Sequence, residues 1–575
     1  RGGSRRARPL CALVALLLAL VAPAVAGAAF PGPVEDNPRT NTPNDPDFDR
    51  CEPDDPDTPT GDCSTYFEEQ SGFFGFSPES ANMVPAVPHS VGATRYVNCD
   101  QLDGPGRAAN LASGDPECAQ ISGVRADSAW KYSTGDPETV IAILDTGIEW
   151  QNRELADKIA LNEAELPLPQ EAGGAPCGAD DCNADGSFDV RDYADDPRVA
   201  DDAGDTESDA ILDGSDLIAA FSDGTDADSN GFVDDIAGWD FFDDDNDPFD
   251  ASSCCSAGGH GTDRALSAAA ATNNGQGEAG MCPDCQIMPL RVWDTFVLPT
   301  DFFAMGTLYA ARNGASVVEG AVGGLTNTRF AREVFEFADS RGVALTLVSS
   351  DINSANHNYP TNYNEAIYVA GSLPDTAPNE TCTGPGDLPV IGNPLPGEFD
   401  PPPEFQEGCD QLLGRLAEQG VNPYVGQPIT TSFFRNSNLT QYGGKADIVM
   451  MGPTGSEATG QASGAAGLLA AYGRETFGDD DPLTGNEIRQ LLTMTAEDVM
   501  PENTGTIGQP DRANEGWDTH FGYGRVNLAA AMKRIADDRV PPEAQIDSPD
   551  WFTPINVDRV DRGGVAVSAR AAAPR

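Results

Sequence analysis

From about residue 121 to residue 536, short apolar runs alternate with longer segments of small and apolar residues at helical spacing. The apolar runs predict buried strands at 140–144, 287–292, 315–318, 343–348, 366–370 and 446–450. The longer segments predict helices at 261–271, 302–313, 328–340 and 457–472. Strands that alternate with helices, and are apolar on both faces, indicate an α/β fold with a mainly parallel sheet between two helical layers. Active sites of such folds lie at the carboxyl ends of the strands.

The rest of the chain divides into segments of different composition. Residues 1–28 combine early arginines, an apolar run and then small residues, which is the order of a secretory signal peptide. The alternative, a membrane-spanning helix, needs ~20 apolar residues, more than this run provides. Residues 29–118 are rich in Pro and Asp and predict an irregular leader or pro-region. The α/β pattern occupies 119–540, and 541–575 is interpreted as the start of a further, truncated domain.

Two loops interrupt the α/β pattern, an acidic insertion at 173–250 and a Pro/Gly-rich loop at about 374–407. In the whole chain, 92 acidic residues outnumber 34 basic ones, and the formal net charge is −58. This charge repels nucleic acid and anionic membrane surfaces, so neither is an expected partner. No segment after the signal has the length and apolarity that stable membrane insertion requires. Salt adaptation and plain solubility also explain acidity, but the clustering in the insertion favours metal binding there.

The 13 cysteines agree with export from the cell. Cys11 lies in the signal, and twelve remain, an even number that includes close pairs. These pairs predict local disulfides: Cys51/Cys63, Cys99/Cys118, Cys177/Cys182, Cys282/Cys285 and Cys382/Cys409. Cys254 and Cys255 are adjacent and have no obvious partner. For Cys282 and Cys285, a zinc or redox site is the alternative, but no second pair lies at ligand spacing with them.

Three residues are candidates for hydrolysis by a serine nucleophile, which needs a base and an acid that orients the base. Asp145 follows the apolar run VIAIL and precedes a Thr-Gly turn. His260 lies in GGHGT before a helix of small residues, whereas the other three histidines lie in irregular segments. Ser456 precedes a helix rich in Ala and Gly, whose N-terminus favours negative charge. Each residue alone also fits an ordinary role in a turn, on the surface or as a helix cap.

Together, the motifs ILDTGI, GHGT and a Ser before a small-residue helix, in the order Asp…His…Ser, resemble the subtilisin-like serine protease family (subtilases). The segments TNNGQGEAGMCPDCQIMPLRV, GASVVEGAVGG and YPTNYNEAIYVAGS also resemble that family. The resemblance covers roughly 121–536 and implies a subtilisin-like fold with Asp145, His260 and Ser456 as the triad. It further implies hydrolysis of peptide bonds in protein or peptide substrates. With the predicted signal peptide, we expect a secreted enzyme, extracellular or at the cell surface.

The chain departs from the family pattern near the nucleophile. The family's Gly-Thr-Ser-x-Ala-x-Pro reads Thr-Gly-Ser-Glu-Ala-Thr-Gly at 454–460. The family's oxyanion asparagine corresponds to Asp351, with Asn353 two residues later, and both are oxyanion candidates. A carboxylate repels an oxyanion unless it is protonated or turned away, and loss of one donor costs about 10²–10³ in rate. After His260, Asp263 and Arg264 replace small apolar residues. These departures support the alternative of a catalytically silent subtilase fold that serves as a calcium-dependent binding or surface module.

The acidic insertion contains two segments with the spacing of calcium loops, in which alternate oxygen ligands and a central Gly fold the chain around Ca²⁺. The first ligand set is Asp181, Asn183, Asp185, Ser187, Asp189 and Asp192. The second is Asp226, Asp228, Asn230 and Asp234. Because Ala237 occupies its last position, this loop would bind only in a shortened form or with help from Asp235. The first segment ends on Asp rather than Glu and so resembles dockerin loops. A solvated acidic surface is the alternative, and we predict structural Ca²⁺ for this insertion.

Overall fold

The computed structural model describes residues 30–35, 41–46, 48, 70–73, 123–200, 211–252, 258–351, 354–355, 358–373, 435–436, 440–452, 454–499, 513–549 and 553–572. The predicted signal peptide, most of the predicted leader, Asn353 and the loop 374–407 lie outside the described residues.

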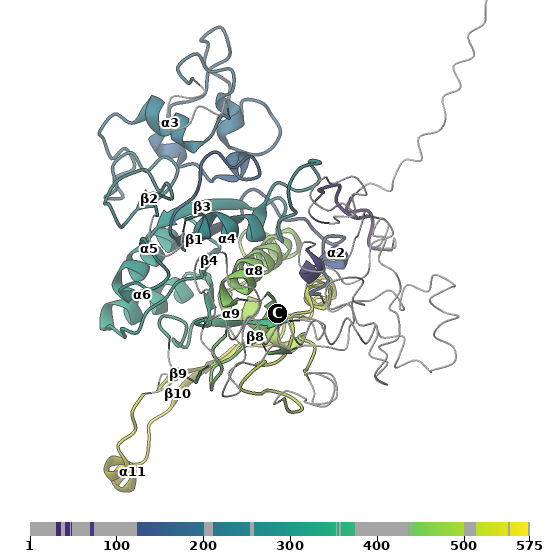
Figure 1. The fold of residues 1–575 in the computed structure, drawn as a ribbon, viewed down its shortest axis with the longest axis vertical. Helices are drawn as coiled ribbons and strands as arrows, with labels where there is room; N and C mark the ends of the chain where they lie inside the picture. Colours follow the sequence, from purple (N-terminus) through teal and green to yellow (C-terminus); the bar gives the residue numbers. More distant parts are fainter. Residues whose placement is uncertain are drawn as a thin grey trace, which may run out of the picture.

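Among the described residues, a sheet of eight strands crosses the centre of the fold (Figure 1). The strands are β1 (Val140–Asp145), β2 (Trp239–Asp240), β3 (Gln286–Arg291), β4 (Val317–Gly320), β5 (Ala344–Val348), β6 (Ile367–Leu373), β7 (Arg435–Asn436) and β8 (Ile448–Met451). Their order is β2-β3-β1-β4-β5-β6-β7, and β8 also pairs with β6. All pairs are parallel except β6 with β7. The predicted mainly parallel sheet is confirmed.

Helices cover both faces of the sheet. One face packs against α4 (His260–Ala269), α8 (Gly455–Phe477), α9 (Gly485–Met494) and α10 (Leu528–Ala536), and the other against α5 (Thr300–Arg312) and α6 (Arg329–Ser340). Successive side chains of a strand point to opposite faces. Accordingly, Ile141 and Ile143 of β1 join the core under α4 and α8, whereas Ala142 and Leu144 join the core under α5 and α6. The three-layer α/β fold class is confirmed.

Helix α8 is longer than its sequence pattern predicts. It begins at Gly455 because the side chain of Thr454 accepts a hydrogen bond from the Glu457 N–H and caps the first turn. It continues to Phe477, and Gly478 follows with a φ of +92°, a conformation that favours glycine and ends helices. The Ala and Gly residues between these ends are buried, so close packing rather than intrinsic helix propensity stabilises this helix.

The acidic insertion forms a lobe around α3 (Gly214–Phe221), at the top of Figure 1. Both α3 and the 3-10 helix Val190–Tyr193 begin with an Asp that caps the first turn in a capping box. Tyr193 and Phe221 pack against each other at 5.5 Å between ring centroids. Tyr193 belongs to the same hydrophobic cluster as the core under α4 and α8, and Phe221 packs against that cluster, so the lobe is joined to the main core beneath its acidic surface.

The described parts of the predicted leader pack on the α/β body. The rings of Phe30, Phe48 and Phe73 surround Trp130, with centroid distances of 5.4, 5.6 and 6.2 Å. Phe48, Phe73 and Trp130 are almost completely buried. The Lys131 ammonium also donates hydrogen bonds to the carbonyl oxygens of residues 31 and 33. These leader residues thus contribute to the hydrophobic core, although their pattern predicts an irregular segment.

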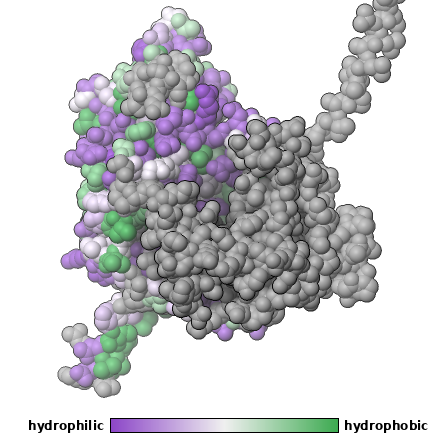
Figure 2. Space-filling view, in the orientation of Figure 1, coloured by the Kyte–Doolittle hydropathy of each residue, from purple (hydrophilic) through white to green (hydrophobic). Residues whose placement is uncertain are grey.

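The C-terminal segment forms a hairpin that extends from the body (Figure 1). Strands β9 (Ala544–Ser548) and β10 (Ser568–Ala571) pair antiparallel, and α11 (Val557–Gly563) lies at the tip. Figure 2 shows hydrophobic atoms along this arm, where Ile555, Val557 and Val567 are exposed. The hairpin contacts the body through Arg570, which pairs with Asp339.

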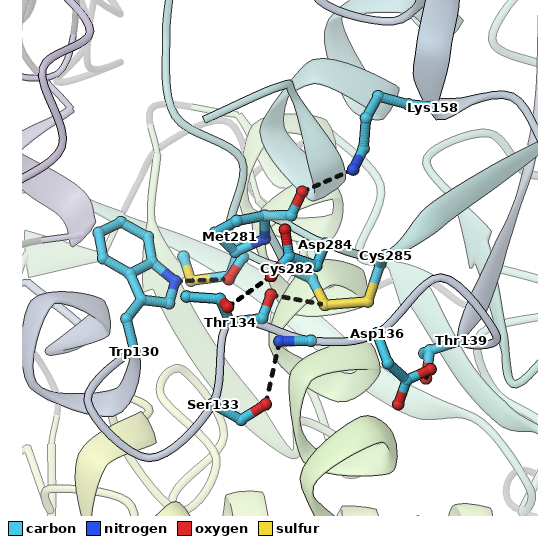
Figure 3. Close-up of a disulfide and its surroundings, with 12 residues drawn as sticks. Trp130, Ser133, Thr134, Asp136, Thr139, Lys158, Met281, Cys282, Asp284 and Cys285 are labelled. Atoms are coloured by element: carbon cyan, nitrogen blue, oxygen red, sulfur yellow. Dashed lines mark hydrogen bonds between the residues drawn. A yellow bond between two sulfur atoms is a disulfide. The ribbon is translucent and has the colours of Figure 1, made fainter. Parts of the chain in front are cut away.

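Two predicted local disulfides, Cys177–Cys182 and Cys282–Cys285, are confirmed. Figure 3 shows the second one at the start of β3, where both cysteines are fully buried. Around it, the Trp130 indole donates to the Met281 carbonyl at 3.0 Å, and Lys158 donates to the Pro283 carbonyl at 2.6 Å. The sulfur–sulfur bond excludes the zinc alternative for this pair in this state. The other predicted cysteine pairs lie outside the described residues.

Candidate active site

Asp145 lies at the carboxyl end of the central strand β1, as the sequence predicts. Its side chain is fully buried, and Oδ1 accepts hydrogen bonds from the Thr146 N–H at 2.8 Å and from His260 Nδ1 at 2.6 Å. Because a carboxylate only accepts, we assign the imidazole proton to Nδ1. This assignment leaves Nε2 as the free basic nitrogen, which is the tautomer that a general base requires.

His260 is the first residue of α4 and leaves 14% of its side chain exposed. Gly259 precedes it with a φ of +79°, so the chain turns sharply into the helix at a position that favours glycine. The Gly261 N–H donates to Thr146 Oγ1 at 3.2 Å, and the Phe296 ring packs edge-on against the imidazole at 4.8 Å. The hydrogen bond fixes the start of α4 against the turn that follows β1, and the ring contact holds the imidazole against the segment that follows β3.

Ser456 is the second residue of α8 and is buried. Its Oγ donates a hydrogen bond to the Ala321 carbonyl, just after β4, at 3.3 Å. Helices α4 and α8 run in parallel: a Cβ at Gly460 would lie 3.1 Å from the Arg264 oxygen, and one at Gly464 would lie 2.5 Å from the Ala268 oxygen.

Both contacts pair a residue of α8 with the residue 196 positions earlier in α4, because 460 and 464 match 264 and 268. One helical turn earlier, the same alignment pairs Ser456 with His260. The fold thus brings all three candidate catalytic residues to the carboxyl edge of the sheet.

Asp351, the first oxyanion candidate, is exposed and follows β5. Its Oδ1 accepts a hydrogen bond from the Gly455 N–H, the first amide of α8, at 2.9 Å. The carboxylate therefore binds the positive end of the helix that carries Ser456. Asn353, the second candidate, lies outside the described residues.

Asp250, the last residue of the acidic insertion, connects that lobe to the site. Its Oδ2 accepts hydrogen bonds from Thr146 Oγ1 and from the Gly259 N–H, each at 2.8 Å. Burial, followed by the charges of Asp250 and Asp263, raises the pKa of the nearby Glu149 carboxyl. The sequence pattern did not indicate this bridging role, because Asp250 is one of many acidic residues in the insertion.

The first predicted calcium loop has a compact backbone. Asp181 accepts hydrogen bonds from the Asp185 N–H and the Gly186 N–H, both at 3.1 Å. Asn183 accepts from the Asp185 N–H at 2.8 Å, and Asp185 from the Ser187 N–H at 3.0 Å. Gly186 has a φ of +93°, as the sharp central turn requires.

The last two acids of this loop have other partners. Asp189 forms an ion pair with Arg191 at 2.5 Å. Asp192 accepts from the backbone of Cys182 and Asn183, at 2.7 and 3.1 Å. The structure therefore brings 181–187 together as one turn, while Asp189 and Asp192 stabilise the helix that follows.

The second predicted calcium loop repeats this turn. Asp226 accepts from the Asn230 N–H and the Gly231 N–H at 3.0 Å, the same two positions that bind Asp181 in the first loop. Asp228 accepts from the Asn230 N–H at 2.9 Å. Asp234 instead accepts from residues 223 and 224 at the start of the loop.

The second loop also lies close to Glu165, a residue outside the predicted ligand set. Carboxylate oxygens of Glu165, Asp228 and Asp235 lie within 4.8 Å of one another. Burial raises the pKa of both Glu165 and Asp235. Glu165 comes from the 3-10 helix Glu163–Glu165, far upstream of the loop, so the loop spacing gave no signal for it. This donor set of clustered carboxylate oxygens fits a hard cation such as Ca²⁺.

The fold and the site define the class of this protein. The model of the subtilase family matches residues 136–524, which is more than half of the chain. The chain therefore belongs to the subtilase family.

Individual relatives match shorter stretches. The chain is 34% identical to thermitase from Thermoactinomyces vulgaris over 138 residues, 24% of this chain and 47% of thermitase. It is 33% identical to the thermophilic serine proteinase of Bacillus sp. (strain AK1) over 135 residues, 23% of this chain and 32% of that protein. The chain thus spans less than half the length of these curated relatives. The fold was also compared with the crystal structure of fervidolysin from Fervidobacterium pennivorans, a keratinolytic enzyme related to subtilisin. That alignment covers 71% of this chain and 44% of the fervidolysin chain, with 16% sequence identity and a TM-score of 0.39.

Proposed function

We propose that this chain is a secreted serine endopeptidase that hydrolyses peptide bonds in protein or peptide substrates. The observation that carries the proposal is the 2.6 Å hydrogen bond between His260 Nδ1 and buried Asp145, at the edge where α8 presents Ser456. Membership of a family whose curated relatives are proteinases supports the same reaction. The signal-like composition of residues 1–28 supports secretion. Among the described residues, no helix has the length and apolarity to cross a membrane.

In the proposed mechanism, Ser456 Oγ turns from the Ala321 carbonyl toward Nε2 of His260 and attacks the scissile carbonyl carbon. His260 takes the hydroxyl proton and gives it to the leaving amine, which leaves an acyl-enzyme for water to hydrolyse by the same route. Asp145 holds the imidazole in the required tautomer and stabilises its protonated form. The Ser456 N–H, in the first turn of α8, faces the developing oxyanion.

Asp351 weakens this oxyanion site. Its carboxylate accepts the Gly455 N–H and so places a negative charge beside the first turn of α8. An asparagine there would offer an amide N–H to the oxyanion, whereas an ionised carboxylate offers only repulsion. We therefore propose an enzyme with a functional triad and a reduced rate of acyl transfer.

We also propose structural calcium in the acidic insertion. Glu165, Asp228 and Asp235 would hold a cation at the second loop, and the turn 181–187 would hold one at the first. Bound Ca²⁺ would neutralise carboxylates that otherwise repel one another. Because Asp250 bonds the end of the insertion to the turn before His260, a stable lobe supports the geometry of the base.

Covalent labelling by a fluorophosphonate probe tests the proposed function, because only an activated serine reacts. We expect the purified chain to label, the Ser456→Ala variant not to label, and the labelling rate to fall when calcium is removed. The alternative function is a silent subtilase-fold binding module, which the carboxylate of Asp351 favours. A folded, calcium-loaded chain that never labels would establish that alternative instead.

A further inference from the structure

A second carboxyl group, Glu319, lies on the catalytic side of the sheet. Glu319 is in β4, the strand next to β1, and pairs in register with Ile143. Ile143 and Asp145 are two residues apart, so their side chains leave the same face of the sheet, the face that α4 and α8 cover. Two residues after Glu319, the Ala321 carbonyl accepts the hydrogen bond of Ser456 Oγ. Glu319 therefore lies on the same face of the sheet as Asp145, two residues before the carbonyl that accepts from Ser456.

The Glu319 carboxyl is isolated from water and from hydrogen-bond partners. The residue is 0% exposed, and neither Oε1 nor Oε2 has a hydrogen-bond partner among the described residues. The Ala321 N–H lies close enough to lower the pKa of Glu319, but it does not form a hydrogen bond of normal geometry with either carboxyl oxygen. A buried carboxylate without partners is strongly unfavourable, and such a group keeps its proton instead. In agreement, burial and then the charge of Asp145 raise its pKa well above the ordinary value.

The groups that face Glu319 come from each element packed around it. Asp145 on β1 carries a negative charge, and its Oδ2 is itself buried without a hydrogen-bond partner. Thr346 on β5 pairs with Glu319 and is neutral. Arg264 on α4 is the cation that lowers the pKa of Glu319, and it lies one helical turn after His260.

Two further acids share the charge of Arg264. Glu457 on α8 and Asp263 on α4 both interact with this guanidinium, and burial raises the pKa of each carboxyl. Asp263 also interacts with His260 and Asp145. Arg264 therefore interacts with three carboxyl groups, and it is not an ion-pair partner of Glu319 alone.

We propose that Glu319 is a positioning residue of the catalytic centre, a second carboxyl held in its neutral form so that Asp145 alone carries the negative charge behind His260. This inference rests on the proposed peptidase function. Its physical basis is the repulsion between two carboxylates in a site that excludes water: Glu319 and Asp145 cannot both be ionised unless one of them moves away. If Glu319 lost its proton, repulsion would push Asp145 away from His260 Nδ1 or draw a proton onto Asp145. The first change breaks the hydrogen bond that fixes the imidazole tautomer, and the second weakens it and removes the charge that stabilises the protonated imidazole.

The test compares wild type with Glu319→Gln, which imitates the neutral carboxyl, and with Glu319→Met, a second neutral variant in case Gln impairs folding. The rate of fluorophosphonate labelling is measured across pH. We expect the neutral variants to keep the acid limb of the wild-type profile. On the alkaline side, the wild-type rate falls by up to about tenfold per pH unit as Glu319 ionises, and the neutral variants lack this fall.

Two readouts do not depend on activity. The infrared difference between wild type and Glu319→Gln should contain the C=O band of a protonated carboxyl. Thermal melts should show Glu319→Gln more stable than wild type, by a margin that grows as pH rises above the ordinary pKa of Glu, because the unfolded wild-type chain then releases a proton that the folded chain retains.

Asp447→Asn is the matched control, since Asp447 is also buried but bonds to Arg489 at 2.8 Å and to the Tyr368 N–H at 2.8 Å. Those partners lower the pKa of Asp447, so its replacement should destabilise the fold and show no protonated-carboxyl band. An acid limb that moves to lower pH in Glu319→Gln, or the absence of the infrared band, would overturn the inference. If no variant labels at all, the peptidase proposal fails, while the infrared band and the melts still decide the state of Glu319.

Discussion

Replacement of Gly261 by alanine should separate the two partners of the His260–Asp145 hydrogen bond. Gly261 follows His260 in the first turn of α4, where the helix touches the end of β1. An added Cβ would lie 3.1 Å from Asp145 Cβ, and it would approach the Gly147 oxygen more closely than 3.0 Å, which real Cβ atoms essentially never do. Because the Gly147 oxygen belongs to the backbone, α4 has to move away from β1.

The size of the effect follows from this overlap. Overpacking by one methyl group in a tight core costs about 1–3 kcal/mol of unfolding free energy. A displacement of about 1 Å between catalytic groups costs about 10² in rate. We therefore expect Gly261→Ala to label with fluorophosphonate about 10²-fold more slowly than wild type, with a moderate loss of stability.

The assay is the labelling rate together with chemical unfolding of the same preparations. Gly443→Ala is the control, because a Cβ at Gly443 would have no neighbour within 4 Å. It should match wild type in both measurements. Wild-type labelling and unchanged unfolding for Gly261→Ala would refute the close approach of α4 to β1 that orients His260.

Four further outcomes are expected. Asp351→Asn should raise the labelling rate by about 10²-fold, since an amide donor replaces an acceptor at the oxyanion; an equal or lower rate would contradict that role. Replacing Cys282 and Cys285 together by serine should lower the unfolding free energy by about 2 kcal/mol, as measured by denaturant titration, because a short closed loop is released. Burial raises the pKa of Glu365 to about 7. The wild type therefore loses stability as pH rises from the ordinary pKa of Glu to about 7, by at most about 3 kcal/mol. Glu365→Gln lacks this loss and should be more stable than wild type at neutral pH and above, as measured by denaturant titration. Calcium chelation should lower the melting temperature, and a melt that is unaffected by chelator would argue for a merely solvated acidic surface.

The sequence predicted the parts of the fold that depend on local pattern. The run VIAIL gave β1 and located Asp145 at its end, because a buried parallel strand is apolar on both faces. The small-residue segments gave α4 and α8, and hence the helix starts that hold His260 and Ser456. These features arise within a few neighbouring residues, which is why one sequence is enough to predict them.

The parts that the sequence did not predict depend on contacts between distant segments. Glu165 joins Asp228 across 63 residues, and no spacing rule links the two. In the sequence, Asp250 does not differ from the other acidic residues of the insertion. Only the folded chain places it beside Thr146, which donates a hydrogen bond to it. Glu319 did leave a signal, a single acid inside the apolar segment VVEGAV, but only the burial of the strand shows that this acid lacks partners.

The three phenylalanines around Trp130 bear on how shortened forms of this protein should be designed. Phe30, Phe48 and Phe73 reach this indole from 57 to 100 positions away in the sequence. A recombinant form that begins at the first residue of the α/β pattern would lack all three rings and expose the indole to water. Its intrinsic fluorescence would shift to longer wavelength, and it would aggregate more readily. Expression boundaries for crystallisation or activity work should therefore lie upstream of Phe30.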